Sequence, residues 1–160
     1  DRLGALIKCN PSIKTPADRA ALRQAVLDGV IDTIGTDHAP HAPEEKDREF
    51  DYAPNWIIGL ETALPICLDV LVRKSKFKLT QVIDLMTRKA ANILKLPAGT
   101  LAAGAVADVC IFDPNETWLY NTYGAFSKSI NSPWNQQQLT GRVKTTIVAG
   151  KIVYANGKMV

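Results

Sequence analysis

Two short apolar runs separated by a helix signal restrict most strongly what the first part of this chain can fold into. The first run, residues 3–9 (LGALIKC), ends at Asn10-Pro11, and proline forces the residue before it into an extended conformation. The second run, residues 30–36 (VIDTIGT), is short and rich in β-branched side chains. Both runs are therefore predicted to be buried strands that end in loops.

The segment between these runs carries the signals of a helix. Thr15 is a suitable N-cap, Pro16 fits the first helical position, Asp18 places an acid in the first turn, and Gly29 ends the helix near residue 28. A strand, a helix and a second strand in this order predict a βαβ unit with a right-handed crossover. We therefore expect an α/β fold with a parallel sheet.

The character of the sequence changes near Pro97. Before it, the pattern predicts helices over residues 59–73, with a kink at Pro65, and 80–88, with Thr80 as N-cap, and a helical turn over 90–96. After it, short β-type runs occur at 107–112, 118–120, 143–149 and 151–154, with hairpin-turn signals at Ala149-Gly150 and Asn156-Gly157. We therefore expect two domains, residues 1–96 and 97–160.

Composition excludes several classes of protein. Nineteen Lys and Arg oppose sixteen Asp and Glu, and 46% of the 160 residues are hydrophobic, as in ordinary globular proteins. The basic residues are scattered and no apolar stretch approaches ~18 residues, so we expect no nucleic-acid partner and no membrane span. Three widely spaced cysteines, Cys9, Cys67 and Cys110, favour reduced thiols and a cytoplasmic location.

The chemistry is expected in the polar stretch over residues 37–57, which follows the second predicted strand. Both histidines of the chain, His38 and His41, lie there directly after Asp37. In parallel α/β folds the loops after the strands hold the active site. A carboxylate fixed at a strand end can bind a metal ion and can also accept and return a proton.

Simpler interpretations of the same residues remain open. Asp37 could cap backbone amides in a turn, and His41 could be exposed and inert. A zinc site needs three or four protein ligands, so either the metal site is absent or its other ligands lie upstream of this sequence. The charged run over residues 44–48 (EEKDR) is expected to be a solvated loop face, with a lid over the site as the alternative.

The segment TDHAPH at residues 36–41, followed by Glu44-Glu45-Lys46, resembles a signature of bacterial-type dihydroorotases in the amidohydrolase superfamily. Further segments are similar to that family in the same order. They are Asn10-Pro11, GLET at residues 59–62, Ala107-Asp108 and Asn131-Ser132-Pro133. The resemblance covers nearly the whole chain but only the C-terminal portion of a family member.

The resemblance implies roles for individual residues. Asp37 matches the aspartate that ligates one ion of a zinc pair and serves as general base and acid. His41 and Asn10 match residues that bind the substrate, and the backbone at Asn55 and Trp56 matches a further substrate contact. His38 has no direct role in that pattern and is assigned to shaping the loop.

Two departures from the family pattern affect these roles. Ser12-Ile13-Lys14 replaces the usual Pro-Leu-Arg, so that a point charge stands where the family has a planar guanidinium. Asn55-Trp56 stands where Phe-Gly is common, and tryptophan adds bulk where the backbone should approach the substrate closely. The contacts expected at Asn55 and Trp56 are therefore open to question.

The resemblance implies the last two βα units of a (β/α)8 barrel followed by part of a small β-sandwich domain. A whole barrel needs about 250 residues, so we expect a fragment whose other zinc ligands lie upstream and which is inactive alone. The implied reaction interconverts N-carbamoyl-L-aspartate and L-dihydroorotate in pyrimidine synthesis. The alternative is a non-catalytic, dihydroorotase-like subunit that assembles with aspartate transcarbamoylase. The implied partners are the small-molecule substrate, the rest of the barrel, and either a second copy or the transcarbamoylase.

Overall fold

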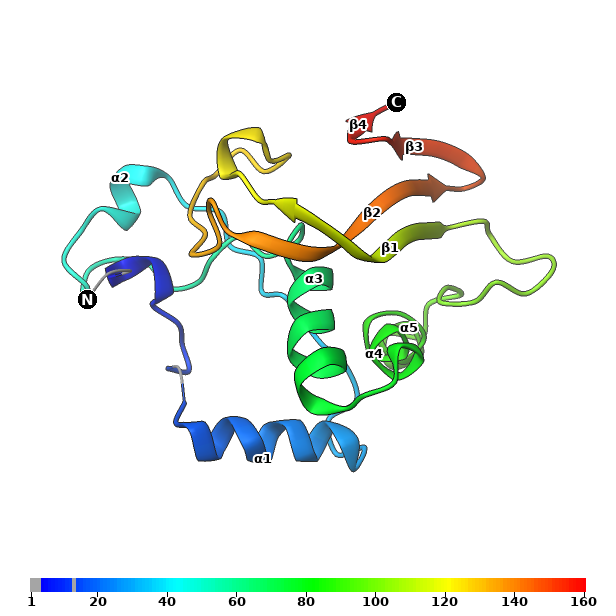
Figure 1. Ribbon diagram of the computed structural model, residues 1–160, viewed down its shortest axis with the longest axis horizontal. Coiled ribbons are helices and arrows are strands. Elements are labelled where there is room, and N and C mark those ends of the chain that lie inside the picture. Colours follow the sequence, from blue (N-terminus) through cyan, green and yellow to red (C-terminus); the bar gives the residue numbers. More distant parts are fainter. Residues whose placement is uncertain (1–3, 13) are drawn as a thin grey trace. The chain divides into compact units, whose positions relative to one another are not determined.

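A computed structural model describes residues 4–12 and 14–160 of the chain, so Leu3 and Ile13 lie outside the described residues. Short helices occupy its first two thirds and a four-stranded sheet occupies its last third (Figure 1). The helices are a 3-10 turn η1 (Gly4–Ile7), α1 (Pro16–Leu27), α2 (Pro43–Lys46), α3 (Ala63–Cys67), a π-helical segment η2 (Leu68–Arg73), α4 (Leu79–Met86), α5 (Arg88–Ile93) and a 3-10 turn η3 (Thr122–Gly124). The strands are β1 (Val109–Leu119), β2 (Gln138–Val148), β3 (Lys151–Ala155) and β4 (Lys158–Met159).

Helix α1 begins and ends as its local signals predict. The Thr15 hydroxyl accepts a hydrogen bond from the Asp18 amide at 3.2 Å, and the Asp18 carboxylate accepts one from the Thr15 amide at 3.1 Å. This reciprocal cap satisfies amides that have no partner within the helix. Gly29, just beyond the helix, has a φ of +74°, a conformation that glycine adopts at little steric cost.

The prediction of strands over residues 3–9 and 30–36 is wrong. In the first run Gly4–Ile7 form η1 and residues 8 and 9 are irregular, and the second run is an irregular segment. Its Ile34 amide and Thr33 hydroxyl instead donate to the carbonyl of Leu85, at 3.3 and 2.8 Å. A strand needs a neighbouring strand to receive its backbone hydrogen bonds, and the described residues supply none for either run.

The helices after residue 62 follow the predicted order with shifted boundaries. The helix expected over residues 59–73 begins at Ala63 and continues as η2 through Arg73. Pro65 lies in its first turn, where the missing amide removes no helical hydrogen bond. The N-cap of α4 is Lys78 rather than Thr80, because the Gln81 side chain accepts the Lys78 amide at 2.9 Å.

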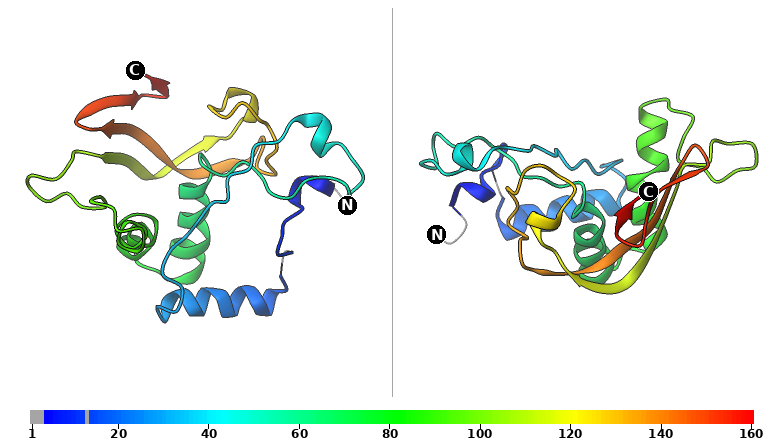
Figure 2. Two further views of the ribbon diagram at one scale, coloured as in Figure 1. Left: turned by 180° about the vertical axis from the view of Figure 1, so that it is seen from behind. Right: turned by 90° about the horizontal axis from the view of Figure 1, so that it is seen from above.

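The four strands follow one another in the sheet in the order β1-β2-β3-β4, and both views of Figure 2 show β1 and β2 side by side. Strand β2 pairs antiparallel with β3, and β3 pairs antiparallel with β4. Both predicted turns are confirmed, since Ala149 and Gly150, like Asn156 and Gly157, have positive φ angles. Between β1 and β2, Glu116 accepts hydrogen bonds from Arg142 at 3.0 Å and Lys144 at 2.7 Å.

The described residues form two units. The first comprises the described residues up to Leu22 together with Thr36–Ala63 and Leu119–Leu139. The second comprises Arg23–Gly35, Leu64–Trp118 and Thr140–Val160. Its core contains Leu71, Phe77 and Val82, with Val26, Ile34, Cys67, Val70, Val72 and Met86 packed against them.

Two further expectations concern the chain as a whole. Within residues 4–12 and 14–160, no helix is long and apolar enough to cross a membrane. The three cysteines are free thiols, with Cys9 and Cys67 partly buried and Cys110 exposed. The division into domains at residues 96–98 stays a prediction.

Candidate functional site

The candidate site lies in the first unit, on the loop that begins at Asp37. Asp37 is exposed and has a φ of +45°, in the left-handed region that aspartate tolerates better than most residues. The loop after it is held in place by two hydrogen bonds. The Ala39 amide donates to the Ile57 carbonyl at 3.0 Å, and the Gly59 amide donates to Nδ1 of His38 at 3.1 Å. His38 therefore has the role of shaping the loop, with Nδ1 unprotonated to accept this bond.

Cys9 lies within electrostatic reach of the same loop. Burial raises the pKa of the Cys9 thiol, Lys46 opposes this effect, and the Asp37 carboxylate raises the pKa further. Burial and the negative charge of Asp37 thus both disfavour the thiolate form of Cys9. Asn10, which follows it, is exposed. Of the departure at residues 12–14, Ile13 lies outside the described residues.

His41 is largely committed to contacts within the protein. Its Nε2 atom lies 3.0 Å from the carbonyl oxygen of Asn55, and because a carbonyl can only accept, Nε2 carries the proton. Its Nδ1 atom is 3.6 Å from a carboxylate oxygen of Glu45. Its backbone amide donates to the side-chain oxygen of Asn131 at 3.2 Å. These contacts fix the orientation of the ring, whose side chain is 23% exposed, and the Asn55 carbonyl requires a proton on Nε2.

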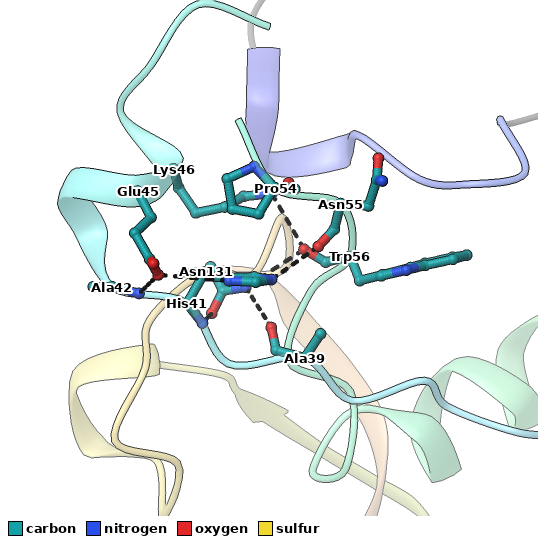
Figure 3. Close-up of polar contacts among 9 residues, drawn as sticks. All are labelled: Ala39, His41, Ala42, Glu45, Lys46, Pro54, Asn55, Trp56 and Asn131. Atoms are coloured by element: carbon teal, nitrogen blue, oxygen red, sulfur yellow. Dashed lines mark hydrogen bonds and ion pairs between the residues drawn. The ribbon is translucent and has the colours of Figure 1, made fainter. Parts of the chain in front are cut away.

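Trp56 adopts a backbone conformation that is unusual for its residue type. Its φ of +77° lies in the left-handed region, where glycine is favoured and a bulky side chain is strained. Its amide donates to the Lys8 carbonyl at 2.8 Å. In Figure 3 its indole points away from the hydrogen-bonded cluster that holds its backbone. Trp56 thus adopts a glycine-like backbone conformation while carrying a large side chain.

Lys46 differs from its predicted environment. The charged run over residues 44–48 was expected to be solvated, yet Lys46 is only 7% exposed. Its ammonium group donates to the carbonyls of Pro54 at 2.9 Å and Trp56 at 3.2 Å. These acceptors and the flexible aliphatic stem allow the residue to be buried. Burial lowers the pKa of Lys46, and the nearby Lys8 lowers it further, while Cys9 acts in the opposite direction.

Asn131 is a second buried polar residue whose structural role the sequence pattern did not reveal. It is 3% exposed, and its amide nitrogen donates to the carbonyls of Ala39 at 2.9 Å and Trp56 at 3.5 Å. The backbone carbonyl of Asn131 accepts a hydrogen bond from the Ile58 amide at 3.1 Å. Figure 3 shows its side chain between the loop of His41 and the segment of Trp56. Asn131 belongs to the Asn-Ser-Pro triplet noted in the sequence, but a local pattern cannot show that its side chain binds the loop of His41.

A cavity of about 330 Å³ adjoins this cluster, also within the first unit. It is bordered by His41, Lys46 and Asn131, and by Leu6, Pro43, Asp47, Thr122, Tyr123, Ile130, Ser132 and Asn135. Its wall therefore combines cationic and amide donors with apolar side chains, a lining suited to a small polar ligand.

The described residues do not form a metal site by themselves. No group of three or more His, Cys, Asp or Glu side chains comes together in residues 4–12 and 14–160. Asp37 nevertheless offers an exposed carboxylate on an irregular loop, and a carboxylate is a type of donor that a zinc or similar ion accepts. The residues present thus fit one ligand of a metal site and not a complete set.

Comparison with known proteins identifies the family of this chain. The model of the Amidohydrolase family matches residues 8–153. The chain therefore belongs to the amidohydrolase family, whose members are generally metal-dependent hydrolases.

Within this family, similar relatives carry the name dihydroorotase. The protein of that name from Anaeromyxobacter dehalogenans (strain 2CP-C) is 44% identical over 151 residues, which cover 94% of this chain and 35% of the relative. The dihydroorotase from Bacillus subtilis (strain 168) is 43% identical, over 96% of this chain and 36% of the relative. The chain thus spans about 35% of the length of the curated relatives that it matches.

Solved structures show the same fold. The L-hydantoinase (dihydropyrimidinase) from Arthrobacter aurescens matches 99% of this chain and 36% of its own with a TM-score of 0.91 and 29% identity. The dihydropyrimidinase from Brevibacillus agri NCHU1002 matches 98% of this chain and 35% of its own with a TM-score of 0.88 and 26% identity. These neighbours place the chain in the TIM-barrel-type α/β fold of amidohydrolases.

Proposed function

We propose that this chain is the C-terminal portion of a zinc-dependent dihydroorotase, which interconverts N-carbamoyl-L-aspartate and L-dihydroorotate. The observation that carries the proposal is the match of 94–96% of the chain, at 43–44% identity, to relatives named dihydroorotase. On this proposal residues 1–96 end the barrel and residues 97–160 belong to a small β-sandwich domain. The rest of the barrel supplies the other zinc ligands, and the enzyme acts in the cytoplasm.

Asp37 is the residue that handles the proton. In the hydrolytic direction its carboxylate takes a proton from the water that attacks the ring carbonyl, and it then delivers the proton to the departing amide nitrogen. Its exposure on the loop supports this role. Bound zinc supplies the polarisation of the ring carbonyl and the lowered pKa of the attacking water, with Asp37 as one ligand.

The substrate carboxylate binds through His41, with Asn10 and the backbone at Asn55 and Trp56 as further contacts. The Nε2–H group of His41, which donates to the Asn55 carbonyl at 3.0 Å, is the donor for this carboxylate. An anionic acceptor forms a stronger, charge-assisted hydrogen bond than a neutral carbonyl, so the substrate carboxylate shares this Nε2–H group with the Asn55 carbonyl, which keeps the proton on Nε2 and the ring in place.

The test replaces Asp37 by asparagine in the complete protein. Asparagine preserves size but cannot accept the proton, so we expect the rate of dihydroorotate hydrolysis to fall at least ~100-fold with the melting temperature unchanged. Asp51→Asn is the matched control, because Asp51 is an exposed carboxylate whose contact with Lys8 uses its backbone carbonyl. An Asp37→Asn enzyme that keeps its rate would show that Asp37 is not the proton carrier.

Metal analysis of the complete wild-type protein separates the enzyme from the scaffold alternative. About two zinc ions per chain, together with hydrolysis, support the enzyme. A protein that contains no zinc, hydrolyses nothing and co-purifies with aspartate transcarbamoylase would instead be the non-catalytic subunit.

A further inference from the structure

We propose that Lys46 is a positioning residue that orients His41 through the segment of residues 54–56. This inference rests on the proposed function for its kinetic consequence, but the contacts that carry it do not. Nothing in the family comparison assigns a role to this lysine, and it lies on the short helix α2, away from Asp37 in the sequence.

The first observation is that a cation is buried without an anionic partner. Lys46 is 7% exposed, and within the described residues no carboxylate lies within ion-pair distance of its ammonium group. The ammonium is bound instead by two neutral carbonyls, those of Pro54 and Trp56. Burying a charge in this way is unfavourable unless its hydrogen bonds are well formed, so the position of these two carbonyls is coupled tightly to Lys46.

The second observation is where these two carbonyls lie. They flank Asn55, whose own carbonyl accepts the Nε2–H group of His41 at 3.0 Å. Lys46 therefore fixes the peptide on each side of the acceptor that sets the ring orientation and tautomer of His41. Figure 3 shows this arrangement, with Lys46 on one side of the segment and His41 and Asn131 on the other.

The third observation is the strain in the same segment. Trp56 holds a φ of +77°, and its carbonyl accepts both Lys46 and Asn131. A left-handed conformation in a bulky residue persists only where its surroundings enforce it. Without the Lys46 contacts the segment is free to relax, and the Asn55 carbonyl then moves away from His41.

Lys8 provides a matched control for Lys46. Its ammonium also binds two carbonyls of the same stretch, those of Asp51 at 2.9 Å and Ala53 at 2.8 Å. These carbonyls precede Asn55 and do not flank it. The two lysines thus have similar chemistry and differ in whether they hold the acceptor of His41.

The experiment compares Lys46→Met, Lys46→Gln and Lys8→Met in the complete protein. Methionine keeps the aliphatic volume and removes the donor, so we expect Lys46→Met to raise the KM for dihydroorotate about tenfold with kcat within about threefold of wild type. Lys8→Met should leave both constants within about twofold. Lys46→Gln, whose side chain is uncharged and one atom shorter and is therefore not expected to hold both carbonyls, is judged by the same criteria if Lys46→Met does not fold.

A second measurement does not depend on activity. In ¹⁵N NMR spectra of histidine-labelled protein, with His41 assigned from the His41→Gln variant, wild type should show a single Nε2–H tautomer. Lys46→Met or Lys46→Gln should convert it to a mixture, whereas Lys8→Met should not. A folded Lys46 variant with an unchanged His41 signal overturns the proposal, as does a shifted signal with an unchanged KM. Absence of hydrolysis in wild type contradicts the proposed function, while the NMR result still decides whether Lys46 orients His41.

Discussion

At the scale of the residue, Trp56 combines the backbone of a glycine with the side chain of a tryptophan. Its amide and carbonyl are both bound, by Lys8 and by Lys46 with Asn131. A left-handed conformation costs an L-residue about 1–2 kcal/mol relative to a right-handed one. The contacts around the peptide therefore offset a local cost that glycine would largely avoid.

We expect Trp56→Gly to be more stable than Trp56→Ala by about 1 kcal/mol in free energy of unfolding. Both variants lose the indole, so their difference isolates the backbone conformation. Denaturant unfolding of the two variants measures it. At Asn55, which is not among the residues with positive φ, the order should reverse and the alanine variant should be the more stable. Equal free energies of unfolding for Trp56→Gly and Trp56→Ala would show that the backbone at residue 56 is not strained.

The residues of the site were predictable in unequal measure. Asp37 and His41 stand out because acidic and imidazole groups follow one another in a polar loop. Lys46 and Asn131 escaped recognition as structural residues because their partners are distant or irregular. Asn131 reaches a carbonyl 92 positions earlier in the chain, which no local pattern reveals. The expected substrate contacts at Asn10, His41, Asn55 and Trp56 stay predictions.

At the scale of the element, local signals predicted the helices and hairpins well. Helix caps, turn glycines and prolines influence the conformation of only a few neighbouring residues. The sequence therefore predicted α1 and the turns of the sheet. The strands expected over residues 3–9 and 30–36 were not found, because a strand depends on a partner that lies elsewhere. The apolar pattern identified segments to be buried but not the hydrogen bonds that would make them strands.

The packing of β2 can be tested at Gly141, where the strand passes close to the buried side chain of Leu68. Its φ is +110°, and an added methyl group would lie 2.5 Å from Cδ1 of Leu68, which is 1% exposed. We expect Gly141→Ala to lower the free energy of unfolding by about 1–3 kcal/mol more than Gly150→Ala. Gly150 also has a positive φ, of +78°, but nothing lies within 4 Å of an added methyl group. Similar losses in both variants would show that β2 does not pack tightly at this position.

At the scale of the whole molecule, the described residues offer one donor to the proposed metal site. Asp37 presents a carboxylate, and the described residues bring no cluster of three metal-binding side chains together. The amidohydrolase fold was recognisable because motifs spread along the sequence resemble those of the family. The remaining ligands could not be inferred from the 160 residues, since a metal site combines distant parts of a chain.

We therefore expect the 160-residue chain on its own to bind zinc only substoichiometrically and to hydrolyse no dihydroorotate. A single carboxylate cannot hold the ion against water, whereas three or four protein ligands can. Metal analysis after dialysis, with the complete protein treated in parallel, measures the difference. Stoichiometric zinc in the short chain would mean that its own side chains form a full coordination sphere.

The hydrogen bonds of Asn131 also bear on the order of events during synthesis. A ribosome makes residues 37–41 long before it makes Asn131, so the amide of His41 and the carbonyl of Ala39 wait for a partner that emerges late. In a nascent chain halted before Asn131, the loop at residues 37–41 would lack these two hydrogen bonds, and a premature stop codon there would remove them permanently.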